Sequence, residues 1–195
     1  MGRIYCIMGK SASGKDTVYK ELLRRFPDLR TYVMYSTRPM REGEKDGVTY
    51  HFVDEDRLRQ YEEQGKLIEK RVYQTMLGPW TYATVDDGQI DPEGHDILML
   101  TTPEAFIKLC SYFGRDRVRD IYIEVEDGER LFRAIKREML EPRPHYDEVC
   151  RRFLADCEDF SEEKLREAGI ERRYDNQDLE ECIQRIAGDM EHEGF

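Results

Sequence analysis

The chain has 195 residues, 39% of them hydrophobic and 37% charged, with a formal net charge of −11. This length suits one domain with a substantial core. Its apolar stretches of about six residues fall far short of the ~20 that cross a bilayer, which excludes a membrane span. The acidic balance argues against nucleic acid as a partner, because a nucleic-acid-binding face needs a long basic stripe.

The N-terminal segment and the cysteines indicate the compartment. The first residues lack the basic flank, the long apolar region and the cleavage site of a secretory signal, and nothing implies an obligate protein partner. The cysteines form no C-x-x-C pair and have no histidine at zinc spacing. The five are Cys6, Cys110, Cys150, Cys157 and Cys182. We therefore expect a cytoplasmic protein with reduced thiols that mostly pack.

Strand-like and helix-like stretches alternate along the first half of the chain. Arg3–Met8 is predicted as a buried strand and Asp16–Phe26 as an amphipathic helix that Pro27 ends. The segment RPMREGEKDG is turn-rich and predicts a surface lobe. The remaining elements of this half are extended stretches at Thr31–Ser36 and Val48–Val53, a helix from Asp54 through Glu63, and strands at Leu67–Tyr73 and Ile97–Thr101.

The alternation continues in the second half. Thr102 at the cap and Pro103 at the first position open a helix that Gly114 closes. A helix at Gly128–Leu140 follows, and its predicted inner face carries Leu131, Ile135 and Met139. The other elements are strands at Ile121–Val125 and Arg172–Tyr174 and helices at Tyr146–Cys157 and Leu179–Met190. This pattern predicts an α/β fold, a parallel sheet with helices on both faces.

A glycine-rich loop, GKSASGKDT, joins the first strand to the first helix. It matches G-x-x-x-x-G-K, with Asp16 where the usual phosphate loop has Ser or Thr, and with Thr17 one place late. Glycines let successive backbone N–H groups point into one concavity, and the helix dipole adds positive potential there. We predict that the loop binds nucleotide phosphates and that Lys15 neutralises the outer ones. The contacting residues would be Gly9, Lys10, Ser11, Ala12, Ser13, Gly14, Lys15, Asp16 and Thr17.

Asp16 needs a cation beside it, because a carboxylate next to a polyphosphate is otherwise repelled. One hypothesis is that Asp16 holds Mg²⁺, directly or through water, in place of the usual hydroxyl. The alternative is a carboxylate at the start of a helix that faces solvent.

The stretch STRPMREGEKDGVTYHFV, residues 36–53, resembles the guanylate kinase family, whose equivalent reads S-T-T-R-x-x-R-x-G-E-x-x-G-x-x-Y-x-F. The resemblance includes the glycine loop, the segment KLIE and the C-terminal NQDLEE, and is strongest before Val53. It implies a P-loop three-layer fold with a central parallel sheet, a small lobe that binds a nucleoside monophosphate (NMP), and a helical lid. A single domain over 1–195 is expected, with its core at 1–33, 97–130 and 160–195, its NMP-binding lobe at about 34–90 and its lid at about 131–158.

The arginines of this stretch suit a phosphate, because guanidinium donors match phosphate oxygens bidentately. In the family, the residues that match Arg38, Arg41 and Tyr50 bind the phosphate of GMP, and we place Ser36 in the same site. Glu69 lies where the family has the carboxylate that accepts hydrogen bonds from the guanine ring. The N1 and N2 donors of guanine suit a carboxylate, whereas the adenine edge does not.

The chain departs from the family pattern at three places in this site. Met34 replaces a serine, so one phosphate donor is missing. The stretch MLGPWTYAT replaces Tyr-Tyr-Gly, and either Tyr82 or Thr84 substitutes there. A strand that ends in two aspartates in the family ends here as LMLTT, with Met99 and Thr101 at those positions, and we include Thr101 among the NMP-binding residues. Losing a charge-assisted hydrogen bond costs roughly 1.5–3 kcal/mol, or about ten- to hundredfold in base discrimination, so the preferred base stays open.

Arginines gather in the predicted lid. Arg130, Arg133 and Arg137 follow one another at i, i+3 and i+7, a stripe whose plain interpretation is a solvated helix face. In the family, arginines that match Arg133, Arg137 and one of Arg151 or Arg152 close over the transferring phosphate, and we favour Arg152.

The residues and the resemblance together predict ATP-dependent phosphoryl transfer to an NMP, foremost GMP to GDP, with Mg²⁺. Such a reaction needs positioning and charge neutralisation more than a dedicated base. The predicted catalytic residues are Lys15, Arg38, Arg133, Arg137 and Arg152, and Asn176 matches the asparagine beside the adenine of ATP. Two alternatives remain: a kinase for a different (deoxy)nucleoside monophosphate, since GKDT loops also occur in such enzymes, and an inactive guanylate-kinase-like binding module.

Overall fold

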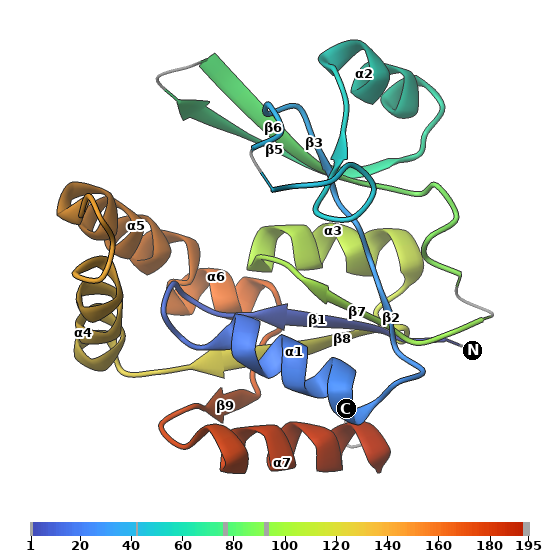
Figure 1. Cartoon of the computed structure of the whole chain (residues 1–195). Helices are drawn as coiled ribbons and strands as arrows, with labels where there is room; N and C mark the ends of the chain where they lie inside the picture. The colour runs from blue at the N-terminus through green and yellow to red at the C-terminus, as the bar shows by residue number, and fades with distance from the viewer. Residues whose placement is uncertain (1, 42, 76–77, 92–93, 193–195) are drawn as a thin grey trace.

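The computed structural model describes residues 2–41, 43–75, 78–91 and 94–192. Figure 1 shows a layered core, a lobe above it and a pair of helices that projects to one side. The core sheet has five strands in the order β2-β7-β1-β8-β9, joined by parallel pairings. These strands are β1 (Ile4–Met8), β2 (Arg30–Thr31), β7 (Ile97–Leu100), β8 (Val118–Glu124) and β9 (Arg173–Asp175).

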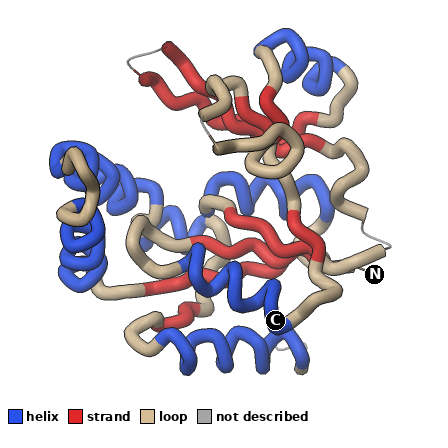
Figure 2. The backbone as a smooth tube through the Cα atoms, in the orientation of Figure 1, coloured by secondary structure: helices blue, strands red, loops and turns tan. Residues whose placement is uncertain are grey.

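Helices cover both faces of this sheet, as Figure 2 also shows. On one face α1 and α7 bury side chains such as Leu22 and Ile186 against the strands, and on the other face α3 and α6 bury Phe106 and Leu165. The bounds are α1 (Lys15–Arg25), α3 (Pro103–Phe113), α6 (Glu162–Glu167) and α7 (Leu179–Glu191). The predicted α/β class with a central parallel sheet is therefore confirmed.

The helix ends follow from local chemistry. Thr102 caps α3, because its Oγ1 accepts from the Ala105 N–H, and Gly114 ends the helix as predicted. Asp54 caps α2 (Glu55–Glu63) in the same way, accepting from the Arg57 N–H over 2.8 Å. In both cases a side-chain oxygen satisfies an N–H that has no partner within the helix.

The lobe contains a second, four-stranded sheet in the order β4-β3-β6-β5, with α2 packed beside it. Its strands are β3 (Tyr35–Ser36), β4 (His51–Phe52), β5 (Leu67–Thr75) and β6 (Gly78–Val85). The predicted stretch 31–36 is split here, since β2 belongs to the core sheet and β3 to the lobe. The prediction at 48–53 was too long, and β6 was not predicted.

The projecting pair is α4 (Asp127–Glu138) and α5 (Tyr146–Asp159). The predicted inner face of α4 was wrong: Ile135 is 37% exposed and Met139 63% exposed. The interpretation of the arginine stripe as a solvated face was also wrong for Arg130, whose exposure is 1%. The physical reason is that α4 packs on α5 and not on the sheet. Ile135 and Met139, on the predicted inner face, therefore stay exposed.

All five cysteines are free thiols, in agreement with the sequence. Cys6 and Cys182 are buried, and burial raises the pKa of Cys182 to about 11, which keeps it protonated at neutral pH. Within the described ranges, no helix combines the length and the apolar character needed to cross a membrane.

A matched pair of substitutions tests where the core lies. We expect Phe106→Ala to lower the free energy of unfolding by about 3–5 kcal/mol, because it leaves a cavity between α3 and the sheet. Phe132→Ala in α4 makes the same chemical change at an exposed position and should stay within about 0.5 kcal/mol. Urea unfolding followed by circular dichroism measures both. Equal losses would contradict the assignment of the core.

Candidate functional site

The loop after β1 folds into a cup because of its second glycine. Gly14 has φ +85°, and a Cβ at this position would collide with Asn176 Nδ2. That amide nitrogen donates to the Ser13 carbonyl over 2.7 Å, which ties the loop to the end of β9. Both the left-handed backbone and the close approach require glycine here.

The two lysines of the loop have different surroundings. Lys10 Nζ lies 3.0 Å from Asp127 Oδ1 at the start of α4. Lys15 Nζ lies 3.9 Å from Asp16 Oδ1, and the Asp16 side chain is 67% exposed. The Lys15 side chain is 27% exposed and lines a cavity described below, with a distant carboxylate beside it. Thr17 is exposed on α1 and belongs to neither of the cavities described below.

A carboxylate from α5 accepts a hydrogen bond from an N–H group of the loop. The Ser11 N–H donates to Asp156 Oδ2 over 2.7 Å. Arg130 Nη1 lies 3.5 Å from the same oxygen, while its Nε lies 2.6 Å from Asp127. The buried guanidinium also stacks 4.1 Å from the Phe153 ring centroid. No short-range pattern in the sequence predicts this network, because it joins residues that lie far apart in the chain.

A cavity of about 880 Å³ opens between the loop and the lid helices. Four loop residues and four arginines contribute to its walls: Ser11, Ala12, Lys15, Asp16, Arg41, Arg137, Arg143 and Arg152. The same walls carry the carboxylates of Glu138, Glu141, Asp147 and Glu148, so the cavity combines anion-binding guanidinium groups with acidic side chains. Of the predicted lid arginines, Arg137 and Arg152 lie here.

A second cavity of about 740 Å³ lies in the lobe. Its walls include Met34, Tyr50, Arg71, Tyr82 and Trp80. Three further residues, Arg41, Glu148 and Arg152, line both this cavity and the one beside the loop. The two spaces therefore meet at a pair of guanidinium groups.

Glu69 is buried beside the second cavity. Its side chain is 4% exposed, with Oε1 accepting from Thr84 Oγ1 over 2.9 Å and Oε2 accepting from Arg71 Nε over 3.2 Å. Of the two alternatives left by the sequence, Thr84 contacts Glu69, whereas Tyr82 stands in the cavity wall with its ring 5.5 Å from that of Tyr50. Arg71 was not predicted, although its position two residues after Glu69 puts both on one face of β5.

Arg38 is held away from both cavities. Its guanidinium donates to Glu44 through two nitrogens, one of them over 2.7 Å, and lies 5.0 Å from the ring centroid of Tyr50. Hydrogen bonds from Arg38 and from the Arg41 N–H lower the pKa of Glu44 to about 2. Ser36 is fully buried, and its Oγ accepts from the Arg38 N–H over 3.3 Å.

The remaining predicted residues lie around these spaces. Arg133 donates to the Asn176 carbonyl over 3.2 Å, on the β9 side of the loop and outside both cavities. Arg152 Nε donates to Glu148 over 2.7 Å, and hydrogen bonds from Arg151 and Arg152 lower the pKa of Glu148 to about 2. Thr101 is buried at the end of β7 and lines neither cavity.

The two strand-end positions, Met99 and Thr101, carry no carboxylate that could bind a cation. Met99 packs in the apolar core cluster that also contains Phe106. Within the described residues, no three His, Cys, Asp or Glu side chains form a group that could hold a metal ion. Asp16 is the acidic loop residue that lines the 880 Å³ cavity beside Lys15.

Comparisons with known proteins identify the family. A family model described as guanylate kinase matches residues 1–94. The guanylate kinase of Helicobacter hepaticus is 35% identical over 139 residues, which are 67% of this chain and 64% of that protein. The guanylate kinase of Mycobacterium bovis is 46% identical over 69 residues, so the match spans only 33% of its length.

The fold comparison covers almost the whole chain. A crystal structure of guanylate kinase from Anaplasma phagocytophilum aligns with a TM-score of 0.63 over 98% of this chain and 86% of that chain, at 23% sequence identity. The guanylate kinase of Alcanivorax borkumensis is 32% identical over 145 residues, which are 67% of this chain and 70% of that protein. With that identity over that share of a relative, the chain belongs to the guanylate kinase family.

Proposed function

We propose that this protein transfers a phosphoryl group from ATP to a nucleoside monophosphate, with GMP as the preferred acceptor. The observation that carries the proposal is that two cavities meet at Arg41 and Arg152. One cavity starts at the glycine loop and the other at the base-binding side of the lobe. A donor phosphate and an acceptor phosphate placed in them would face each other across guanidinium groups, which is the arrangement that phosphoryl transfer needs.

On the donor side, the loop N–H groups and Lys15 would bind the phosphates of ATP. Asn176 Oδ1 and Ser13 Oγ are buried and have no hydrogen-bond partner among the described residues. A buried acceptor without a partner is costly, and the amino group of adenine is a donor that would satisfy Asn176. The family resemblance, in which the residue that matches Asn176 lies beside adenine, supports ATP as the donor.

On the acceptor side, Arg41 and Tyr50 would bind the phosphate of the monophosphate, and the base would lie near Arg71, which lines the cavity and donates to Glu69. Arg38 can join them only after it leaves Glu44, because that carboxylate now accepts from two of its nitrogens. A phosphate carries the same charge sign and the same bidentate geometry as the carboxylate that it would replace.

Transfer itself would depend on the lid, which we assign to residues about 131–158. We assign the NMP-binding lobe to about 34–90 and the core to 1–33, 97–130 and 160–195. Closure of α4 and α5 would bring Arg137 and Arg152 onto the transferring group and exclude water. Arg133 would support the ATP side through its contact with the Asn176 carbonyl.

Mg²⁺ fits the donor cavity through Asp16. Magnesium is commonly bound by one or two protein carboxylates and by substrate phosphates, so a single exposed carboxylate beside Lys15 is sufficient. When bound, the ion would neutralise phosphate charge. Asp16 would then supply the carboxylate that the family has at the end of β7, where this chain has Met99 and Thr101.

The proposal is tested with a panel of nucleoside monophosphates, each incubated with ATP and Mg²⁺ in a coupled assay. We expect GMP to give the highest kcat/KM. Arg137→Ala should lower kcat about hundred- to thousandfold, because the variant removes charge stabilisation from the transferring group. Lys136→Ala, a neighbour outside the cavity, is the matched control and should leave kcat unchanged. Turnover of none of the monophosphates by the wild-type protein would refute the proposed activity.

A second prediction concerns Asp16. Asp16→Asn keeps the shape of the side chain and removes its charge, so the Mg²⁺ concentration for half-maximal turnover should rise about tenfold, the usual loss for one charged contact. Glu21→Gln removes a charge one turn later on the same helix and should not change this concentration. A Mg²⁺ dependence identical to that of the wild type would show that Asp16 simply faces solvent.

A third prediction concerns the carboxylate on the loop. ATP must displace Asp156 from the Ser11 N–H or bind beside its charge, and both cost free energy. Asp156→Asn keeps the acceptor and removes the charge, so we expect the Kd for ATP to fall about fivefold, measured by titration calorimetry. Glu158→Gln on the exposed side of α5 is the control. A Kd that does not change would mean that the loop releases Asp156 without cost.

A further inference from the structure

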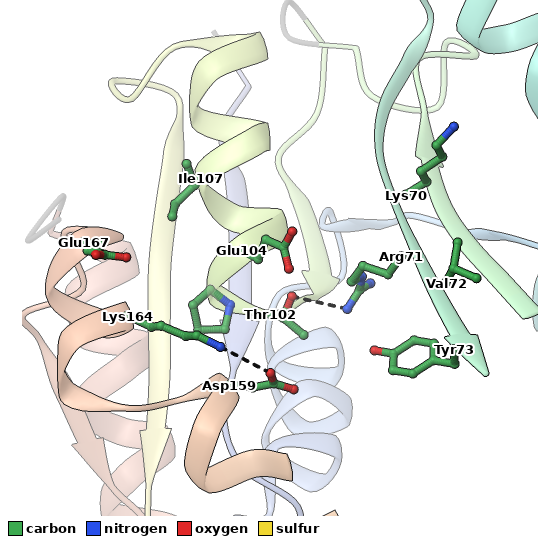
Figure 3. A pocket seen from close by; sticks show the side chains of 11 residues that line it. Lys70, Arg71, Val72, Tyr73, Thr102, Glu104, Ile107, Asp159, Lys164 and Glu167 are labelled. Atoms are coloured by element: carbon green, nitrogen blue, oxygen red, sulfur yellow. Dashed lines mark hydrogen bonds and ion pairs between the residues drawn. The ribbon is translucent and has the colours of Figure 1, made fainter. Parts of the chain in front are cut away.

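Arg71 stands between the second cavity and the carboxylate of Glu69. Arg71 lines the 740 Å³ cavity, whereas Glu69 is not among its lining residues and has 4% of its side chain exposed. Arg71 also lines an adjacent cavity of about 460 Å³, shown in Figure 3, where it reaches from β5 to Thr102 at the start of α3. A base that enters the 740 Å³ cavity therefore meets the guanidinium before it meets the carboxylate.

The contacts of Arg71 fix the plane of its guanidinium. Nε donates to Glu69 Oε2 over 3.2 Å and Nη1 donates to Thr102 Oγ1 over 3.3 Å. Thr102 in turn accepts from the Ala105 N–H as the cap of α3, so its hydroxyl is itself held in place. A guanidinium has five N–H donors, and these two contacts use two of them.

The row of side chains on this face of β5 and β6 suits a flat ring. Arg71 pairs with Tyr82 across the two strands, and Tyr73 pairs with Trp80. The rings of Tyr73 and Tyr82 are 5.6 Å apart. These two rings contact each other edge to face and both line the 740 Å³ cavity, so an aromatic base would pack against them from the cavity side. Its edge could then face Arg71, and a guanidinium binds the O6 and N7 acceptors of guanine bidentately.

We infer that Arg71 is a specificity-determining residue, which binds the O6 and N7 acceptors of a 6-oxopurine and excludes adenine through its amino group. The inference rests on the proposed transfer to a nucleoside monophosphate and extends it. Because Glu69 lies behind the guanidinium, the 2-amino group of guanine contributes little. Hypoxanthine has the same O6 and N7 acceptors, so IMP is expected to be a substrate within about tenfold of GMP.

The test measures kcat/KM for GMP, IMP and 6-thio-GMP, in which a poorly accepting sulfur replaces O6. The wild type should prefer GMP over 6-thio-GMP about ten- to hundredfold, and in Arg71→Ala this ratio should fall to about one. Arg71→Gln, which keeps much of the side-chain length, should give the same loss and guards against misfolding of the alanine variant. Lys70→Ala is the matched control, since Lys70 pairs with Glu62 of α2, and its ratios should equal those of the wild type.

A residue that merely orients Glu69 would behave differently. Arg71→Ala would then keep the wild-type ratio of GMP to 6-thio-GMP and change the ratio of GMP to IMP, and this result would overturn the inference. The same ratios are measured as dissociation constants by calorimetry. A wild type that binds GMP without turnover would refute the proposed activity. The ratio of its dissociation constants for GMP and 6-thio-GMP, compared with the same ratio in Arg71→Ala, would still show whether Arg71 binds O6. Equal dissociation constants for the two nucleotides in the wild type would reject the role of Arg71.

Discussion

Charge balance around the glycine loop and the two arginine-lined cavities governs how this structure is built. The chain carries a net charge of −11 and yet presents two cavities suited to anions. It does so by pairing guanidinium groups with its own carboxylates, Arg38 with Glu44 and Arg152 with Glu148. Even a backbone N–H of the glycine loop has such a partner in Asp156. These carboxylates hold the guanidinium and N–H groups in place. A bound phosphate would replace a carboxylate with another oxygen anion.

The two sheets position these groups. Parallel strands all end at the same edge of the core sheet, so the loop after β1 and the start of α4 after β8 lie together there. The Lys10–Asp127 pair joins those two segments directly. The lobe adds its own wall through β5 and β6, whose long antiparallel pairing aligns Glu69, Arg71 and their partners on one face. The site therefore draws its residues from both sheets and from the helices beside them.

Much of the core could be predicted from local patterns. The strand at the start of the chain, the glycine loop and the helix after Pro103 all carry signals within a few residues, and each lies where the sequence placed it. β6 begins with Gly78 and Pro79, which read as a loop, and only pairing with β5 makes it a strand. The burial of Arg130 depends on Asp156 and Phe153 from another helix, and no short-range pattern reports such contacts.

The tie between Asn176 and the glycine loop has a consequence for how the protein is made. The two contact residues are separated by 163 positions in the chain. The loop emerges from the ribosome among the first residues, but its shape depends on an amide that is synthesised near the end. That contact therefore forms only when nearly all of the polypeptide is available, so a nascent fragment would hold the glycine loop without it.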